Sequence, residues 1–264
     1  MDRFRKLFPE PYPVIGLIHL PPLPDYASSP GIESIIKCAL ADLQVLTAAR
    51  VDGVLIENEY DRPHRIAAEV ATIDAMTRVT RAVVAESRDI VVGCEILLND
   101  PRASLQVAAE TGAKFIRTDY FVDRMLRPEY GEFSIDPDGL VAYRSGIEAG
   151  EVLILADIQV KYATMLEERS IAESAKLACD HHADAVVVTG DATGHAPARQ
   201  QLTEAGSGSS VPVLIGSGMD TDNVSSILPA CDGAIVGTAL MRNCRVDEDR
   251  ARRLMSEVGR VRAS

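Results

Sequence analysis

Eight short apolar runs, each followed by a longer segment of helical periodicity, restrict the fold of this sequence more than any other feature. The runs have the length of strands buried on both faces, and they occupy residues 13–19, 52–58, 90–97, 114–121, 152–161, 184–191, 211–217 and 232–238. The helical segments lie at about 31–49, 65–87, 101–111, 137–149, 170–182, 195–205, 221–229 and 246–260. Strict alternation of strand and helix predicts a parallel sheet covered by helices, and eight strands close such a sheet into a (β/α)₈ barrel, the TIM barrel.

The chain length supports one barrel, because 264 residues are close to the roughly 250 that are typical of this fold. No linker divides the sequence, so we predict a single domain over residues 1–264 with an N-terminal extension at 1–12. An open doubly wound sheet is the alternative, but the turn after the first strand, HLPPLPD, lacks the Gly-rich dinucleotide fingerprint. Long loops at 20–30 and 122–136 follow strands on the active-site face, whereas GSGSS at 206–210 precedes a strand and predicts a flexible connection.

Charge and composition argue against several kinds of partner. A formal net charge of −12 disfavours binding to nucleic acid or to anionic membranes. The five cysteines are scattered without CxxC spacing, and no apolar segment is long enough to span a membrane, so a cytoplasmic protein is expected. Phe4, Leu7, Phe8 and Tyr12 lie outside the barrel repeat and need cover from the barrel or from a second subunit, which predicts a homo-oligomer.

Polar side chains gather near the carboxyl ends of the expected strands. Alternate residues of a barrel strand point at the interior, and one row of the run 152–161 is apolar at its start and polar at its end. This row reads Leu153, Leu155, Asp157, Gln159 and Lys161. The other strands contribute His19, Glu57, Asn58, Glu95, Arg117, Asp119, Thr189 and Asp191 at the same level. Such a gradient is what an active site at the mouth of a barrel requires.

Seven charged residues of this set are predicted to converge on one cavity as catalytic candidates: Asp157, Lys161, Asp119, Glu57, Glu95, Arg117 and Asp191. His19, Asn58, Gln159 and Thr189 are the further candidates for binding a substrate. The carboxylates can serve as a general acid and base, or they can hold Mg²⁺, and no other cofactor is indicated. The alternative is structural, with ion pairs of Arg117 and Lys161 that hold the top of the barrel together.

Lys161 has two possible roles. It can be a nucleophile that forms a Schiff base with a carbonyl, or a cation that holds substrate oxygens. Asp157, two residues away on the same row, favours the charged ammonium over the free amine that a Schiff base needs. The electrostatic role is therefore preferred.

Two glycine-containing segments follow the last two strands, PVLIGSGM at 212–219 and DGAIVGTAL at 232–240. In (β/α)₈ barrels these loops frequently hold a phosphate group, because glycines let backbone amides approach an anion and hydroxyl groups add donors. The candidate phosphate-binding residues are Gly216, Ser217, Gly218, Gly237 and Thr238. Backbone amides need no excess of positive charge, so a small phosphorylated ligand is compatible with an acidic protein. The alternative is that these glycines serve only tight turns.

The sequence resembles the BtpA/SgcQ family in segments spread over nearly the whole chain. These segments are VIGLIHLPPLP (14–24), DGVLIENEYDRP (52–63), ILLNDPRASLQVAAETGAKFIR (96–117), ILADIQVKYA (154–163), DAVVVTGDATG (184–194) and LIGSGMDTDN (214–223). The resemblance implies a barrel related to phosphate-binding TIM barrels. The family name comes from a role in photosystem I accumulation in cyanobacteria, and relatives in organisms without photosynthesis resemble sugar-metabolism proteins. EILLN at 95–99 and the pair Glu59 and Tyr60 depart from the usual family pattern, which implies a different choice of substrate.

Two functions follow from these observations. The first is an enzyme that acts on a small phosphorylated metabolite, a sugar phosphate or a nucleotide-derived ribosyl phosphate, as a lyase, isomerase or glycosidase with carboxylate acid–base chemistry. The second is a non-catalytic assembly or regulatory factor, of the photosystem I type that the resemblance implies, which retains a phosphate site. The polar inward rows favour the enzyme, because a scaffold has no reason to keep desolvated charge at the mouth.

Overall fold

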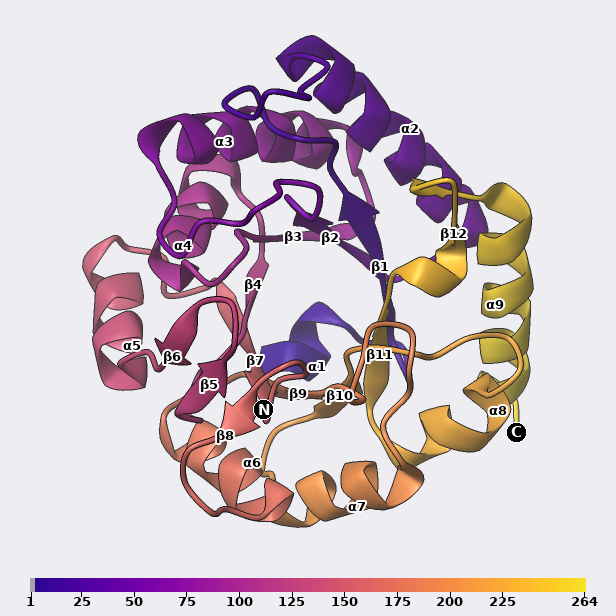
Figure 1. Cartoon of the computed structure of the whole chain (residues 1–264). Coiled ribbons are helices and arrows are strands. Elements are labelled where there is room, and N and C mark those ends of the chain that lie inside the picture. The colour runs from indigo at the N-terminus through magenta and orange to yellow at the C-terminus, as the bar shows by residue number, and fades with distance from the viewer. Residues whose placement is uncertain (1–2) are drawn as a thin grey trace.

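The computed structural model describes residues 3–264 and is a closed barrel of eight parallel strands inside a ring of helices (Figure 1). The barrel strands are β1 (Val14–His19), β2 (Gly53–Glu57), β3 (Val91–Glu95), β4 (Phe115–Thr118), β7 (Leu153–Ile158), β9 (Ala185–Val188), β10 (Val213–Ile215) and β11 (Gly233–Val236). They stand in this order around the barrel, and β11 pairs with β1 to close it. Every predicted strand is present, so the predicted (β/α)₈ architecture is confirmed.

The helices that cover the barrel also follow the sequence pattern. They are α2 (Ile32–Ala49), α3 (Val70–Glu86), α4 (Pro101–Thr111), α5 (Pro137–Gly146), α6 (Ile171–Asp180), α7 (Arg199–Gly208), α8 (Val224–Ile227) with the 3₁₀ turn η1 (Leu228–Ala230), and α9 (Glu248–Arg262). Helix α7 continues through Gly208, so the predicted flexible connection at 206–210 is wrong over its first three residues. A Cβ on Gly208 would lie 2.0 Å from the carbonyl oxygen of Ala172, and its absence lets α7 pack closely on α6.

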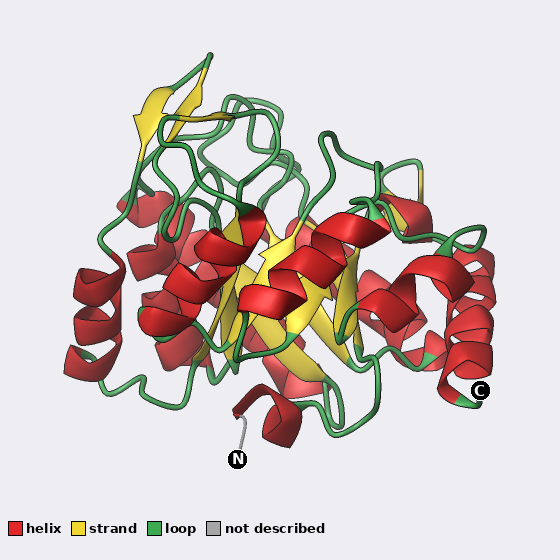
Figure 2. Ribbon diagram, turned by 90° about the horizontal axis from the view of Figure 1, so that it is seen from below, coloured by secondary structure: helices red, strands yellow, loops and turns green. Residues whose placement is uncertain are grey.

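The N-terminal segment closes the end of the barrel opposite the mouth. Helix α1 (Arg3–Leu7) lies below the strands (Figure 2), and Phe4 and Phe8 are only 1% and 3% exposed among the interior side chains. The Phe8 ring meets Phe115 of β4 edge-on at 5.9 Å between centroids. The apolar groups that predicted a homo-oligomer are therefore largely covered by their own barrel, which removes the main reason for that prediction without testing it. Residues 1–2 of the extension lie outside the described residues.

The barrel interior is filled by side chains rather than left as a pore. Its lower layers consist of apolar residues from all around the barrel, among them Ile15, Leu55, Phe115, Leu153 and Val187. A Cβ on Gly93 of β3 would come within 2.3 Å of the Phe115 ring, so the missing side chain makes room for that aromatic group. With the lower half packed, only the mouth at the carboxyl ends of the strands can receive a ligand.

A recurring aspartate aligns three barrel strands with their neighbours. Asp52, Asp184 and Asp232 each precede a strand, and each exchanges two hydrogen bonds with one residue of the preceding strand in the barrel order. Their amides donate to the carbonyl oxygens of Val14, Ile154 and Val213, and their carboxylates accept from the amides of the same three residues. Each carboxylate also binds an arginine, namely Arg262, Arg144 and Arg5 respectively.

Loops at the mouth carry additional strands. The predicted insertion after β4 contains β5 (Met125–Arg127) and β6 (Gly131–Phe133), which form a three-stranded antiparallel sheet with β8 (Thr164–Met165) from the loop after β7. This sheet stands above one side of the mouth (Figure 2). The 3₁₀ turn η2 (Thr238–Leu240) and the short strands β12 (Met241–Arg242) and β13 (Arg245–Val246) follow β11.

Over residues 3–264, no helix combines the length and apolar character needed to cross a bilayer.

Candidate functional site

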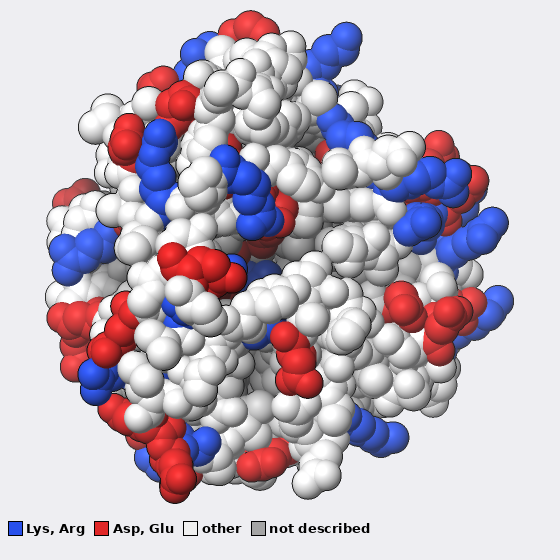
Figure 3. Space-filling model, viewed as in Figure 1, with Lys and Arg blue, Asp and Glu red and all other residues white. Residues whose placement is uncertain are grey.

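A polar cavity of about 120 Å³ opens at the mouth of the barrel. Its floor carries Glu57, Glu95, Arg117 and Asp119 from the ends of β2, β3 and β4, or just beyond them. The loops above contribute Glu59, Arg62, His64, Leu97, Leu98, Arg127, Val160, Lys161, Tyr162 and Thr193. Charged groups of both signs surround the hollow at the centre of this face (Figure 3). The cavity is small and charged, which suits a compact polar ligand.

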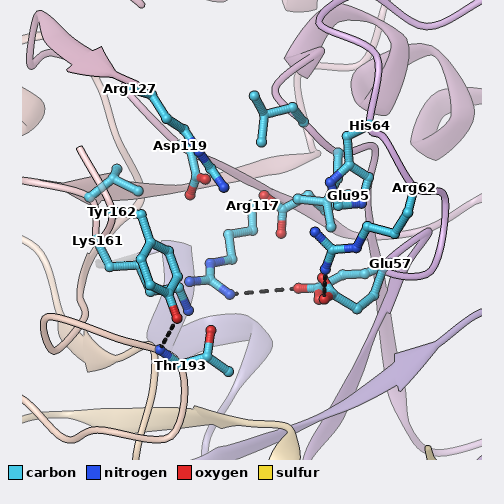
Figure 4. A pocket seen from close by; sticks show the side chains of 14 residues that line it. Glu57, Arg62, His64, Glu95, Arg117, Asp119, Arg127, Lys161, Tyr162 and Thr193 are labelled. Carbon is cyan, nitrogen blue, oxygen red and sulfur yellow. Dashed lines mark hydrogen bonds and ion pairs between the residues drawn. The ribbon is translucent and has the colours of Figure 1, made fainter. Parts of the chain in front are cut away.

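Arg117 lies at the centre of the floor and is fixed by a carboxylate beneath it. Its Nε and Nη2 each donate a 2.8 Å hydrogen bond to Asp157 of β7, and its Nη1 lies 3.6 Å from Glu57 (Figure 4). Asp157 is completely buried, and both of its oxygens are bound to Arg117. Asp157 therefore does not line the cavity, and a positioning role replaces the direct acid–base role predicted for it.

The end of β10 makes room for the Arg117 guanidinium. A Cβ on Gly216 would lie 3.1 Å from Nη2 of Arg117 and 2.9 Å from Cγ2 of Thr189. The Gly216 amide donates a 2.8 Å hydrogen bond to the carbonyl oxygen of Val188. The prediction that this amide contacts a phosphate is therefore wrong, because the barrel ladder already uses it. Gly216 is required for space above Arg117.

The carboxyl groups of the floor hold protons at unusually high pH. Burial, followed by the nearby carboxylates of Asp157 and Glu95, raises the pKa of Asp119 to about 8. Burial raises the pKa of Glu57 to about 7 in spite of Arg117. Burial also raises the pKa of Glu95 well above its ordinary value, and a hydrogen bond to Glu57 adds to that increase. At neutral pH the floor thus offers carboxylic acids that can donate a proton beside a carboxyl near its midpoint.

The inward row of β7 ends earlier than predicted. Leu153, Leu155 and Asp157 point inward, but the strand stops at Ile158 and Gln159 has a positive φ of 47°. The Gln159 side chain donates to the carbonyl oxygen of Arg169 and to the Ser174 hydroxyl of α6. The predicted continuation of the row to Gln159 is therefore wrong. Lys161 still reaches the cavity because the loop turns back toward it.

The end of β9 diverges from the prediction in the same way. The strand stops at Val188, and the following loop carries Asp191 to an exposed position. Asp191 and Thr189 line a neighbouring cavity with Gln159 and Lys161, so Asp191 shares a cavity with Lys161, but its predicted convergence with the floor carboxylates is wrong. Thr189 is 6% exposed, and its hydroxyl has no hydrogen-bond partner among the described residues.

Two other predicted substrate contacts lie outside the cavity lining. Asn58 is 1% exposed, and its side chain bonds to Asp61 and to both backbone polar groups of Leu97, so it clamps the loops after β2 and β3 together. The Nε2 atom of His19 lies 3.3 Å from Glu57, and burial lowers the pKa of His19 to about 4. His19 is therefore neutral at neutral pH, and its Nε2 has no hydrogen-bond partner among the described residues.

The loops supply lining residues that the strand pattern could not identify, notably Arg62, His64, Arg127 and Tyr162. His64 is 6% exposed, its Nε2 has no partner among residues 3–264, and burial lowers its pKa to about 4. A neutral imidazole beside the floor carboxyls can accept or donate a proton. The only sequence signal for His64 is its position directly after DGVLIENEYDRP (52–63), a segment that resembles the family.

A second cavity of about 380 Å³ adjoins the first beyond the loop at Thr193 and Gly194. Gly218 and Thr238 line it, and their backbone N–H groups donate no hydrogen bond to any of the described residues. Arg250 and Arg253 of α9 contribute the cations, and Asp220 and Asp222 also line it.

Other members of the predicted phosphate set are used within the protein. Ser217 accepts a hydrogen bond from the Gly190 amide and donates one to the carbonyl oxygen of His195, so its hydroxyl joins two loops. A Cβ on Gly237 would lie 2.7 Å from Leu17, so this residue permits close packing. An anion in the second cavity would therefore meet Gly218, Thr238 and the two arginines rather than the full predicted set.

The floor does not have the form of a preorganised metal site. Among residues 3–264, no three His, Cys, Asp or Glu side chains are placed to hold one metal ion. The carboxylates instead surround Arg117, and two of them share a hydrogen bond. Mg²⁺ is commonly held by one or two carboxylates together with a substrate phosphate, so the possible use of Mg²⁺ stays a prediction.

Comparisons of structure find the same barrel fold in solved structures. The chain superposes on thiamine phosphate pyrophosphorylase from Pyrococcus furiosus with a TM-score of 0.62, 13% sequence identity and 98% coverage of both chains. Phosphoribosyl anthranilate isomerase from Thermus thermophilus gives a TM-score of 0.60 at 10% identity, covering 94% of this chain and 99% of that one. At these identities the likeness demonstrates a common fold.

Comparisons of sequence are more specific. The photosystem I biogenesis protein BtpA of Synechocystis is 34% identical over 258 residues, covering 94% of this chain and 86% of the relative. A relative from Archaeoglobus fulgidus is 32% identical over 245 residues, covering 92% and 96%. The model of the BtpA family matches residues 10–260. The chain therefore belongs to the BtpA family.

Proposed function

We propose that this protein is an enzyme that acts on a small phosphorylated metabolite at the barrel mouth by carboxyl acid–base chemistry. The observation that carries the proposal is the floor of the cavity, where Arg117 is buried among carboxyl groups that face open space. Desolvating this many charges is costly, and the cluster lies where TIM barrels carry out their chemistry.

Each floor residue has a role that its surroundings support. Asp119 is a suitable general acid, because burial and neighbouring carboxylates raise its pKa to about 8. Glu57, whose pKa burial raises to about 7, can exchange a proton with substrate in either direction near neutral pH. Arg117, held by Asp157, can stabilise negative charge that develops on a substrate oxygen. Isomerase, lyase and glycosidase reactions all use such a set.

The second cavity supplies the place for a phosphate group. The amides of Gly218 and Thr238 and the side chains of Arg250 and Arg253 provide donors and positive charge where phosphate-binding barrels hold their ligands. The names of the two barrels compared above contain a phosphate or phosphoribosyl group, in keeping with the proposal. A sugar phosphate or a ribosyl phosphate could then span from this cavity to the acid–base floor.

A thermal-shift screen tests the proposal with matched sugars, each with and without its phosphate, in the presence and absence of Mg²⁺. A ligand at a hundredfold excess over its Kd should stabilise the fold by about 2.7 kcal/mol. We expect stabilisation by a phosphorylated compound and its loss in Arg250→Gln/Arg253→Gln. Arg252→Gln is the matched control, because Arg252 lies between these residues but pairs with Glu248 and Asp249. Equal stabilisation of all three proteins would contradict the phosphate assignment.

A non-catalytic assembly factor is the second candidate, and the name of the Synechocystis relative favours it. A relative of similar identity comes from an archaeon, which has no photosystem I. The enzyme requires intact floor carboxyls, whereas an assembly factor does not. Complementation of a strain that lacks its own family member by wild type and by Glu95→Gln separates the two: rescue by both favours assembly, and rescue by the wild type alone favours catalysis.

A further inference from the structure

Two cations on the wall of the first cavity lack a close counter-charge. Lys161 forms no ion pair with any carboxylate among residues 3–264. The Nε of Arg127 lies 3.5 Å from Glu129, but the Glu129 side chain is 64% exposed and that of Arg127 only 16%. An exposed carboxylate at this distance leaves much of the Arg127 charge uncompensated. The remaining cations of the cavity are engaged, Arg62 with Glu59 and Arg117 with Asp157.

The Arg127 side chain is fixed in place before any ligand arrives. Its guanidinium lies 5.4 Å from the Tyr130 ring centre and 5.9 Å from that of Tyr162. Its side chain also interacts with the buried Tyr120 hydroxyl, and its Nε is buried 3.5 Å from Glu129. Arg127 belongs to β5 of the three-stranded sheet, so the sheet above the mouth holds this donor beside Asp119, on the side of the cavity where Tyr162 and Lys161 also lie (Figure 4). The terminal nitrogens of this guanidinium, rather than the buried Nε, are therefore the donors that can meet an anion in the cavity.

The nearest floor carboxyl does not neutralise these cations at neutral pH. Burial and the surrounding carboxylates raise the pKa of Asp119 to about 8, so this group is mostly an uncharged acid. The wall therefore keeps a surplus of positive charge, although the whole protein is acidic. An anionic group of a ligand is the partner that this arrangement fits.

The loop that carries Lys161 is joined to the wall of the second cavity. The Tyr162 hydroxyl accepts a 2.8 Å hydrogen bond from the Thr193 amide. Thr193 lines the first cavity and Gly194 lines the second, so the two cavities share this loop as a wall. The two groups of cations therefore lie on either side of one loop.

We propose that Arg127 and Lys161 form a second anion subsite, which takes a carboxylate or phosphate group at the end of the substrate opposite the first phosphate. The inference rests on the proposed function and narrows the substrate class to metabolites with two anionic ends. The three-stranded sheet of β5, β6 and β8 then selects substrates by charge through Arg127, and a singly phosphorylated neutral sugar is a poor ligand.

Selenate, a tetrahedral dianion with an anomalous X-ray signal, probes both subsites in soaked crystals. In the wild type we expect one selenate at Arg127 and Lys161 and another at Gly218, Thr238 and the α9 arginines. Lys161→Gln should lose only the first. Parallel soaks with malonate and with inorganic phosphate show which oxyanion displaces that selenate at lower concentration, and so distinguish a carboxylate from a phosphate.

A phosphate titration of the melting temperature tests the same subsite in solution. Loss of one charge-assisted contact should weaken its phosphate binding by at least about tenfold in Lys161→Gln and in Arg127→Gln. Two controls should titrate like the wild type: Arg124→Gln, whose residue pairs with Glu132 beside β5, and Lys176→Gln, whose residue pairs with Asp180. Arg127→Lys keeps the charge without the stacked guanidinium and should lose less than Arg127→Gln.

The outcomes separate this inference from the proposed function. Selenate only in the second cavity overturns the second subsite and leaves the phosphate pocket intact. Selenate only at Arg127 and Lys161 supports the subsite and overturns the phosphate pocket. A selenate peak at Lys161 with identical phosphate titrations of wild type and Lys161→Gln would be an adventitious ion only, and would also overturn the inference.

Discussion

Arg117 organises the site at the scale of single residues. Burial lowers its pKa, but the carboxylates of Asp157, Glu95 and Glu57 outweigh burial and raise that pKa well above the ordinary value, so the guanidinium stays charged. A buried charge of this kind is stable only when it is paired and hydrogen-bonded, which is what Asp157 provides. One fixed cation thus allows several carboxyls to share a small space.

The raised pKa values predict a specific dependence of stability on pH. Asp119 binds its proton more tightly in the folded chain, at a pKa of about 8 against an ordinary 3.8, and Glu57 shifts in the same direction. Their stabilising contribution is complete below about pH 4 and is lost as the pH rises through 7 to 8. Between these limits the folded state holds more protons than the unfolded state, so raising the pH favours unfolding. The loss should be on the order of 1 kcal/mol per pH unit for each such group.

Asp119→Asn removes one titrating group and should flatten this dependence. Relative to the wild type, the variant gains stability between pH 5 and pH 8.5, as measured by urea unfolding across that range. Asp180→Asn serves as the control, because Asp180 is an exposed partner of Lys176 and should leave the slope unchanged. Parallel curves for wild type and Asp119→Asn would show that Asp119 does not titrate in this window.

At the scale of elements, strands could be predicted and loops could not. Alternation of side chains correctly predicts that Leu153, Leu155 and Asp157 point inward, because hydrogen bonding to both neighbours enforces the period of two. Beyond Ile158 that constraint ends, and Gln159 turns toward α6. The pattern of barrel strands likewise could not predict Arg127 as a site residue, because a hairpin within an insertion brings it over the mouth. The phosphate prediction for Gly216 is wrong because the sequence does not distinguish a glycine that makes room for a side chain, here Arg117, from a glycine that binds phosphate.

The aspartates that precede β2, β9 and β11 predict a large stability effect at one strand start. The carboxylate of Asp184 accepts hydrogen bonds from the Ile154 amide and from Arg144, and both ionic side chains are 7% exposed. Asp184→Asn keeps the shape of the side chain but leaves Arg144 buried without its counter-charge. The expected cost is about 3–5 kcal/mol in the free energy of unfolding, measured in urea.

Asp138→Asn gives the matched comparison for Asp184→Asn. Asp138 is paired with His181, but its side chain is 75% exposed, so its removal should cost at most about 1 kcal/mol. If the two variants lose similar stability, the paired aspartates would not align the strands in the way inferred here.

At the scale of the whole molecule, the barrel is closed at one end and charged at the other. Helix α1 and the phenylalanines of the N-terminal segment fill the lower end, so a ligand can approach only from the mouth. There the acid–base floor and the cavity of Gly218 and Thr238 lie on either side of one loop. Under the proposed function, the floor is the reactive centre and the second cavity binds the phosphate group of the same ligand.

The most direct measurement of the central claim is turnover in a mixture of phosphorylated metabolites, followed by mass spectrometry. The account predicts that the wild type consumes a phosphorylated compound and forms a defined product. Glu95→Gln should lose a factor of about 10² or more in kcat while remaining folded. Arg250→Gln should act mainly by raising KM. Turnover by Glu95→Gln at the wild-type rate, or no consumption of any phosphorylated compound by the wild type, would contradict the account.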